Sequence, residues 1–224
     1  MTYLRALMAA ACIALVAGAA TAGAWPRDEG EVFVSVGGNF ALFNGAVRPV
    51  HYDPTIYLEY GLTDRLTLGL DGYLADAGTA GSGFAFIRWP LGRAEGADPV
   101  AVSLGFGAVI LPDATVEPSG RLGVHWGRAL DNGWLAVDAE IVQAFRADRR
   151  QTKVEASWGY RFAGGWSSIL SAQAGTGLTG DFYAKVMPSV AYEWSEGITL
   201  RLGLTQALTG DHGTGLTFQT WITF

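Results

Sequence analysis

The sequence predicts an all-β fold, namely a closed antiparallel transmembrane β-barrel of about 12 strands, with 10 as the lower bound. Two observations predict this fold. Runs of alternating apolar and polar residues follow one another along the chain, and their period of two belongs to half-buried strands and not to helices. The connections between the runs alternate between tight turns and longer segments that are rich in Gly, Asp and Arg. An even number of strands would bring both ends of the chain to the side of the tight turns.

Residues 56–74 show the pattern most clearly, because two alternating runs flank the polar turn at residues 63–65. In the second run, leucine occupies positions 66, 68, 70 and 74, whereas Thr, Gly, Asp and Tyr occupy positions 67, 69, 71 and 73. Such a hairpin separates an apolar medium from a polar one. In a soluble sandwich the apolar face would meet a second sheet, and in an outer-membrane barrel it would meet lipid.

The same alternation recurs along the chain. Together with the two runs just described, it predicts strands at residues 31–42, 56–62, 66–74, 83–91, 100–110, 121–127, 135–141, 153–162, 166–175, 182–194, 198–205 and 216–224. Tight turns are expected after residues 62, 91, 130, 162 and 194. Short periplasmic turns and longer external loops are the arrangement typical of outer-membrane barrels. Pro188 lies inside an expected strand, where it has no N–H to donate, so we expect a β-bulge there.

The N-terminal residues 1–24 are typical of a secretory signal peptide. They combine Arg5, an apolar centre and the small-residue site at positions 22–24, so we expect residues 25–224 to form the mature barrel. Cys12 is the only cysteine and lies in the signal peptide, which excludes disulfides and cysteine metal sites from the mature chain. The net charge is −6 with both signs interspersed, and this distribution excludes a nucleic-acid partner.

Aromatic residues lie beside the expected tight turns and would form a girdle at one membrane interface. They are Tyr60, Trp89, Trp134, Tyr160, Phe162, Trp166, Tyr192, Trp194 and Phe224. A soluble sandwich of this size does not need so many strands of matching length, so the aromatic positions favour the barrel.

The last expected strand, residues 216–224, alternates and ends in phenylalanine. Together with the signal peptide and the preceding strands, it resembles the C-terminal signature of Gram-negative outer-membrane β-barrel proteins. This resemblance implies a location in the cell outer membrane, contact with outer-membrane lipid, and recognition by the barrel-insertion machinery through Leu216, Phe218, Ile222 and Phe224. The size and strand pattern also resemble the barrel family associated with the meta-pathway of phenol degradation, in which small apolar compounds are thought to cross the outer membrane.

The inward positions of the expected strands carry charges of both signs. The candidate lumen-lining residues are Glu59, Asp71, Arg88, Arg121, His125, Asp138, Glu140, Lys153, Glu155, Lys185 and Arg201. Ion pairs between these cations and carboxylates would satisfy the charges across a narrow interior, which is the arrangement that we favour. Hydrated charges that line a wet pore are the alternative.

His125 is expected level with Asp138 on the next strand, with Ser157 one strand further, and these positions are compatible with a Ser-His-Asp arrangement. The surrounding residues do not match outer-membrane phospholipases or palmitoyltransferases, and a lumenal serine is poorly placed for membrane lipid. We therefore expect no catalytic residues and no enzyme. His51 and His212 are too isolated to bind a metal, and no nucleotide-binding glycine motif occurs, so no cofactor is expected.

These features favour passive passage or binding of small molecules, apolar compounds included, with such a solute as the partner. A structural or surface-interaction barrel without transport is the second interpretation, and a lipid-modifying outer-membrane enzyme is the third. Both an open and a plugged lumen are compatible with the sequence.

Overall fold

The structure is a computed structural model that describes residues 23–43, 51–75, 78–92, 98–111, 113–210 and 213–224. Residues 1–22 of the expected signal peptide, with Cys12, lie outside the described residues, as does His212. Within the described part of the chain, no helix is both long enough and apolar enough to cross a bilayer.

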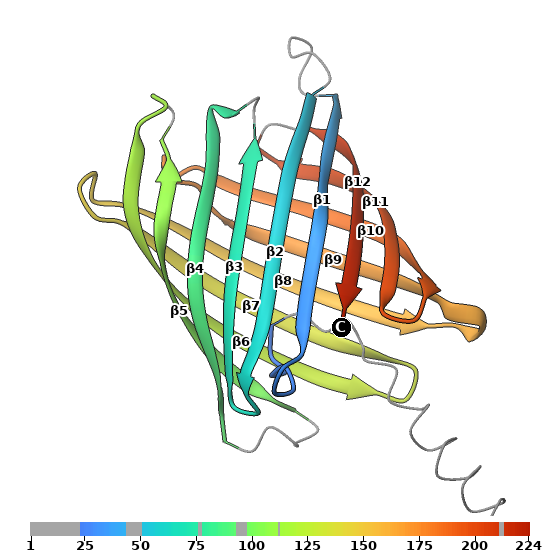
Figure 1. The fold of residues 1–224 in the computed structure, drawn as a ribbon. Helices are drawn as coiled ribbons and strands as arrows, with labels where there is room; N and C mark the ends of the chain where they lie inside the picture. The colour runs from blue at the N-terminus through green and yellow to red at the C-terminus, as the bar shows by residue number, and fades with distance from the viewer. Residues whose placement is uncertain (1–22, 44–50, 76–77, 93–97, 112, 211–212) are drawn as a thin grey trace, which may run out of the picture.

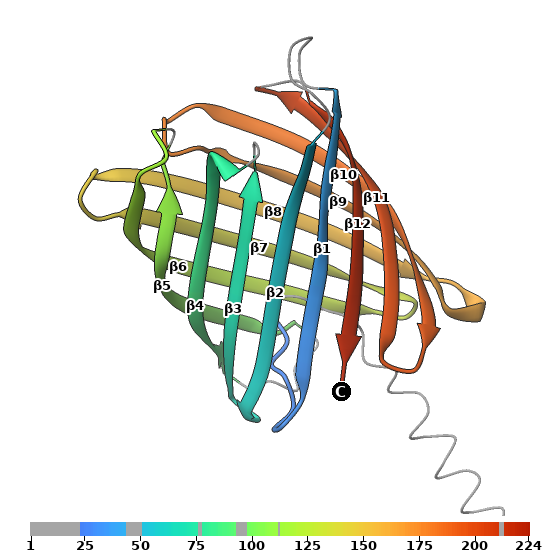
Figure 2. The same ribbon diagram turned by 45° about the horizontal axis from the view of Figure 1, so that its top comes forward.

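The strands form one closed antiparallel barrel, which confirms the predicted fold class (Figures 1 and 2). The strands are β1 (Val32–Phe43), β2 (His51–Thr63), β3 (Leu66–Ala75), β4 (Ala80–Leu91), β5 (Val100–Ile110), β6 (Val116–Leu130), β7 (Gly133–Ala144), β8 (Arg149–Arg161), β9 (Trp166–Thr176), β10 (Phe182–Ser195), β11 (Ile198–Thr209) and β12 (Thr214–Thr223). Each strand pairs with its neighbours in sequence, and β1 closes the ring against β12 over residues 33–43. In Figure 1, β6 to β10 run behind β1 to β5 and cross them steeply.

The connections have the predicted asymmetry, with two exceptions. One end of the barrel, the expected periplasmic end, holds the start of β1 and the end of β12. The two-residue turns at 64–65, 131–132 and 196–197 lie at the same end. One exception is the connection between β8 and β9, residues 162–165, which contains the 3-10 helix η2 (Ala163–Gly165) and is no shorter than several connections at the opposite end. The other is the connection between β4 and β5, residues 92–99, which belongs to the same end as the two-residue turns and is longer than these turns. Several strands also begin earlier than predicted. β2 begins at His51 and β8 at Arg149, because backbone pairing continues beyond the positions where apolar alternation stops.

Pro188 causes no bulge, contrary to the prediction. It pairs with Leu170 on β9, and on the β11 side the pairs Val186 with Gln206 and Ser189 with Gly203 keep one register. The register shifts of this ladder lie elsewhere, between residues 184 and 185 and between residues 193 and 195. A proline removes one donor from the ladder but does not require an additional residue, so the pairing is interrupted without a shift.

The barrel has an inverted polarity. Large apolar side chains such as Leu104, Phe106 and Leu170 are about half exposed or more on the outer face, at 53%, 66% and 49%. The largest fully buried side chain is instead the carboxylate of Glu59. A closed ring of strands with an apolar exterior and a polar interior fits a bilayer and leaves no place for the second sheet of a sandwich.

The aromatic girdle is present with one member missing. Two neighbouring ring pairs, Tyr160 with Phe162 and Trp166 with Tyr192, have centroids 4.8 and 4.7 Å apart. The indole of Trp134, however, is only 7% exposed and faces the lumen, where a Cβ on Gly159 would meet it. Trp134 shares the phase of the inward positions on β7, and the alternation of the strand decides its face although it lies beside a turn.

We predict that Leu202→Arg lowers the free energy of unfolding by about 2–4 kcal/mol in a phospholipid bilayer, because Leu202 is 53% exposed on the outer face near the middle of β11. Thr205→Lys is the matched control, since Thr205 lies on the inner face of the same strand and hydrogen-bonds Thr217. Urea unfolding of the barrel in vesicles measures both changes. Equal losses of stability in the two variants would contradict the assigned faces.

Candidate functional site

The eleven candidate residues all lie on the inner face of the barrel. Nine of them line a central cavity of about 390 Å³: Asp71, Arg88, Arg121, His125, Asp138, Glu140, Lys153, Glu155 and Arg201. Glu59 is completely covered, and the ammonium of Lys185 lies 6.0 Å from the ring centroid of Tyr183. The structure therefore brings the predicted charges together along one continuous interior.

The first cluster surrounds the carboxylate of Glu59 near the periplasmic end. Arg27 Nε lies 2.6 Å from Oε2, and Arg88 Nη1 lies 2.5 Å from Oε1. The hydroxyl of Tyr57 donates to Oε1 over 2.5 Å and accepts from Arg88 Nη2 over 2.6 Å. Arg27 also pairs with Glu31 at 3.1 Å, so two guanidiniums are balanced by two carboxylates. This balance allows the charges to remain ionised although Arg27, Glu59 and Arg88 are buried.

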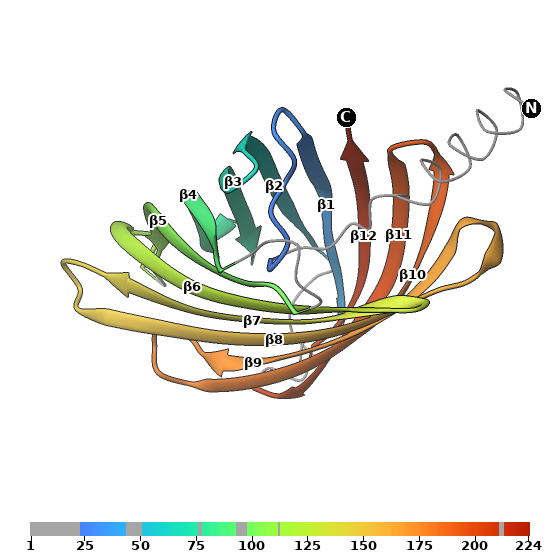
Figure 3. The ribbon, with the colours of Figure 1, turned by 90° about the horizontal axis from the view of Figure 1, so that it is seen from below.

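Arg27 belongs to a segment, residues 23–31, that enters the lumen before β1 begins (Figure 3). Its backbone is tied to the wall, since Gly30 N donates to Gly61 O over 2.8 Å and Gly61 N donates to Glu31 O over 2.9 Å. Ala24 is fully buried, and the ring of Trp25 occupies the space in which a Cβ on Gly127 would lie. We call residues 23–31 the lumenal segment. It fills part of the periplasmic half of the barrel.

The lumenal segment was not predicted from the sequence, which indicated only a polar stretch between the signal peptide and the first strand. Gly23 and Ala24 belong to the expected signal peptide, yet in this structure they lie inside the barrel. The backbone of Gly23 approaches the carboxylate of Asp138 so closely that a Cβ would be 2.1 Å from Oδ1. Removal of residues 23 and 24 by processing would leave Trp25 at the start of the segment.

The second cluster lies across the cavity on β3, β6, β7 and β8. Arg121 pairs with Asp71, and Lys153 Nζ lies 2.8 Å from Glu140 Oε2. The guanidinium of Arg121 also lies over the ring of Phe84, 4.8 Å from its centroid. The pair of Lys153 and Glu140 joins the neighbouring strands β8 and β7, whereas the pair of Arg121 and Asp71 reaches across the lumen from β6 to β3.

Arg201 lies on the opposite wall of the cavity, and its hydrogen-bond partners are neutral side chains. Its Nε donates to Ser189 Oγ over 2.9 Å, and its Nη1 donates to Gln219 Oε1 over 3.2 Å. The guanidinium lies 5.5 Å from the ring centroid of Trp221. Within the described part of the chain, these contacts leave the Arg201 cation at the cavity surface without a carboxylate in direct contact.

His125 forms a hydrogen-bonded chain with two inward side chains. Its Nδ1 lies 2.6 Å from Asp138 Oδ1, as the sequence suggested, and its Nε2 lies 2.9 Å from Ser103 Oγ. Ser157, the serine that the sequence placed near His125, is instead hydrogen-bonded through its Oγ to Ser171 Oγ over 2.7 Å. Ser103 was missed because its link to His125 runs diagonally between strands and depends on the register of β5 and β6.

Tyr57 was also missed, although it lies two residues before Glu59 on the same face and could have been found from the alternation. Arg27 carried no such signal, since it precedes the strands. Among the described residues, no three His, Cys, Asp or Glu side chains are grouped so that they could hold a metal ion.

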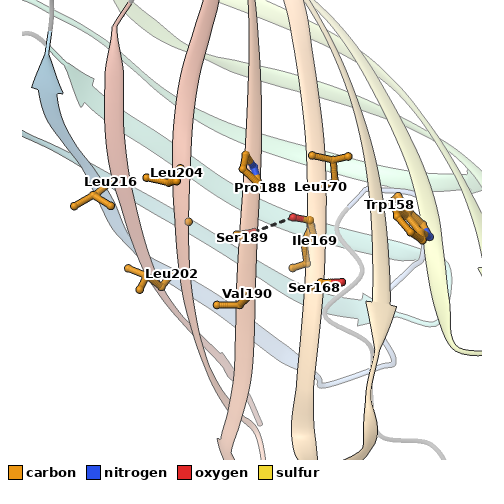
Figure 4. Close-up of a pocket in the computed structure, with 11 residues that line it drawn as sticks. Trp158, Ser168, Ile169, Leu170, Pro188, Ser189, Val190, Leu202, Leu204 and Leu216 are labelled. Atoms are coloured by element: carbon orange, nitrogen blue, oxygen red, sulfur yellow. Dashed lines mark hydrogen bonds between the residues drawn. The ribbon is translucent and has the colours of Figure 1, made fainter.

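A second hollow, of about 580 Å³, lies on the outer face around Pro188 (Figure 4). Trp158, Leu170, Leu204 and Leu216 surround it, and Pro188 stands between them in the figure. It coincides with the interrupted pairing of β10 and β11. Its apolar lining matches the hydrocarbon of a bilayer rather than the contents of the lumen.

Two solved outer-membrane proteins share this architecture. Residues covering 92% of the chain superpose on 99% of the COG4313 outer membrane channel from Pseudomonas putida F1, with a TM-score of 0.61 and 13% identity. The KdgM porin gives a TM-score of 0.61 at 8% identity, covering 87% of this chain and 99% of that one. No family model and no curated protein matches the sequence, so the resemblance to the phenol-degradation barrel family is not shown. The likeness shows that the chain has the fold of outer-membrane channels.

We predict that Glu59→Gln lowers the free energy of unfolding by about 3–5 kcal/mol, because it leaves the buried guanidiniums of Arg27 and Arg88 without their shared carboxylate. Glu196→Gln, in an exposed turn, is the control and should change stability by less than about 0.5 kcal/mol. Unfolding followed by tryptophan fluorescence in detergent checks both. A Glu59 variant as stable as the control would show that the cluster is hydrated.

Proposed function

We propose that this protein is an outer-membrane channel through which small molecules pass passively. The observation that carries the proposal is a charge-lined central cavity of about 390 Å³ inside a closed barrel whose outer face is apolar. A barrel with an apolar exterior partitions into the bilayer, and a polar interior gives solutes a path that avoids hydrocarbon. The shared fold with two proteins described as a channel and a porin supports this function.

The path is narrow, which limits the size of the solute. Ion pairs such as that of Lys153 and Glu140 extend into the cavity, and the lumenal segment occupies its periplasmic side. The cavity wall also includes the rings of Phe33, Phe86 and Trp221. A mixed lining of charges and aromatic rings suits small organic molecules, apolar compounds included, better than large hydrophilic ones.

A structural barrel without transport is the second candidate. The observation that favours it is the extent to which ion pairs and the lumenal segment fill the interior, with Arg27, Glu59 and Arg88 all buried. The two functions differ in conductance. Removal of a single lumenal contact should leave the conductance of a structural barrel unchanged, whereas it should raise the conductance of a channel.

The partners follow from the outer face and the last strand. We propose that the apolar exterior, with the hollow around Pro188, contacts outer-membrane lipid. We also propose that the barrel-insertion machinery recognises β12 through Leu216, Phe218, Ile222 and Phe224. Phe224 is 74% exposed, and its backbone still pairs with Val32, so the terminal ring is presented on an ordered strand.

We predict that the wild-type barrel has a small conductance in planar bilayers and that Arg27→Ser raises it several-fold. The change removes the ionic contact that holds the lumenal segment but leaves Glu59 paired with Arg88. Arg65→Ser, at an exposed turn, is the matched control and should leave conductance unchanged. Absence of conductance in all three proteins would favour the structural barrel.

We also predict that Glu140→Gln and Lys153→Met shift ion selectivity in opposite directions. The first leaves a cation at the cavity and favours anions, whereas the second leaves a carboxylate and favours cations. Reversal potentials in a salt gradient measure the effect. Shifts of the same sign, or none, would mean that ions do not pass between these two side chains.

A further inference from the structure

Ser103, His125 and Asp138 form a hydrogen-bonded chain across three adjacent strands, β5, β6 and β7. A carboxylate can only accept hydrogen bonds, so His125 Nδ1 carries the proton that bridges the 2.6 Å to Asp138 Oδ1. In the neutral imidazole, His125 Nε2 is then the acceptor for the hydroxyl of Ser103 at 2.9 Å. This order of donors and acceptors is the one in which a histidine acts as general base for a serine and a carboxylate fixes its tautomer.

The backbone is shaped to allow this contact. His125 stands opposite Asp138 in the register, whereas Ser103 stands opposite Gly123, two residues away from His125. A Cβ on Gly123 would lie 2.4 Å from Ser103 Oγ and 2.8 Å from His125 Nε2. The absent side chain at Gly123 is therefore what lets the imidazole reach diagonally to the serine.

Two arginines neighbour Ser103 in the strand ladder. Arg88 is its direct partner on β4, and Arg121 lies on β6 on the other side of Gly123 from His125. Both side chains are buried, and within the described part of the chain the Nε of each has no hydrogen-bond partner. The two guanidiniums pair with Glu59 and Asp71, respectively, and the unpaired Nε–H groups are the donors that an oxyanion in this part of the cavity would draw on.

All five side chains line the same central cavity of about 390 Å³. Ser103 is only 3% exposed, but it borders this space, so a small molecule inside the lumen would meet it. The inner face excludes membrane lipid, whose acyl chains contact the outer face. The substrate class that fits is consequently a small, uncharged carboxylic ester that enters the lumen.

We propose that Ser103 is a nucleophile that hydrolyses small carboxylic esters within the lumen, with His125 as general base and Asp138 as the positioning residue. Ser103 Oγ attacks the carbonyl carbon while its proton moves to His125 Nε2. The intermediate expels the alcohol, which takes that proton, and the acyl group remains as an ester on Ser103. Water then attacks this ester, gives a proton to Nε2, and releases the carboxylic acid as Ser103 recovers its proton.

This inference requires that small molecules reach the cavity, and it does not require that they cross the barrel. If the protein conducts ions but Ser103 is not acylated, the proposed channel function stands and the proposed ester hydrolysis fails. If Ser103 is acylated but the protein does not conduct, the reverse holds.

The test uses p-nitrophenyl acetate with the full barrel purified from outer membranes in detergent. We expect release of p-nitrophenol and an acetyl group on the peptide that contains Ser103, found by mass spectrometry. Ser103→Ala and His125→Gln should each lower the rate of p-nitrophenol release, after subtraction of the uncatalysed rate, by about 100-fold or more. Gly123→Ala should do so as well, although it retains all three side chains. Ser171→Ala is the matched control, since Ser171 is a buried lumenal serine whose hydroxyl bonds that of Ser157.

Heat-dependent gel mobility establishes that each variant is folded, and Arg27→Ser provides a barrel with a loosened lumenal segment. Acetylation of Ser103 in the wild type or in Arg27→Ser that is lost with His125→Gln supports the proposal. The proposal is overturned if neither protein is acetylated at Ser103, if Ser171 is labelled equally, or if labelling survives His125→Gln. The chain of hydrogen bonds would then be a structural network of the lumen.

Discussion

Closure of the backbone hydrogen-bond ladder is the constraint on which the rest of the structure depends. A bilayer offers no partner for an unpaired N–H or C=O, so the edge of β1 must be covered by β12, and it is paired from Phe33 to Phe43. Once the ring is closed, every residue of every strand faces either lipid or lumen. The interrupted pairing beside Pro188 shows how much the ring tolerates, since the register on either side of it is unchanged.

Closure also determines where the charges lie. A charged side chain cannot face hydrocarbon at low cost, so the charges in the middle of the strands are directed into a narrow interior, whereas Arg128 near the end of β6 is exposed and pairs with Asp98. Glu59 shows the result, since it is completely covered and is held by two guanidiniums and a phenol. One of those guanidiniums belongs to Arg27, which lies in the lumenal segment and not in a strand of the wall. The lumenal segment is thus held by the same electrostatic need that satisfies the wall.

The fold could be predicted because lipid on one side and polar groups on the other impose a period of two, which is visible at Leu68 and Glu59 without any knowledge of pairing. The site could be predicted only as far as this period extends. It directed His125 and Asp138 inward, but the contact of His125 with Ser103 depends on the register of β5 with β6 and on the bare backbone of Gly123. It gave no information on Arg27, which precedes the strands. Trp134 was assigned from its proximity to a turn, and the phase of its strand overruled that assignment.

The wall and the lumenal contents are energetically separate in one important respect. The ladder of twelve strands is complete without the lumenal segment. The segment is held by backbone bonds at Gly61, the bond from Arg27 N to Thr67 Oγ1, the ion pair of Arg27 with Glu59 and the packing of Trp25. Because it is not part of the ladder, it can leave the lumen without opening the ring. The barrel therefore separates two requirements that a soluble fold usually combines. The backbone ladder closes without the segment, whereas access to the cavity with its Ser103, His125 and Asp138 chain depends on where the segment lies.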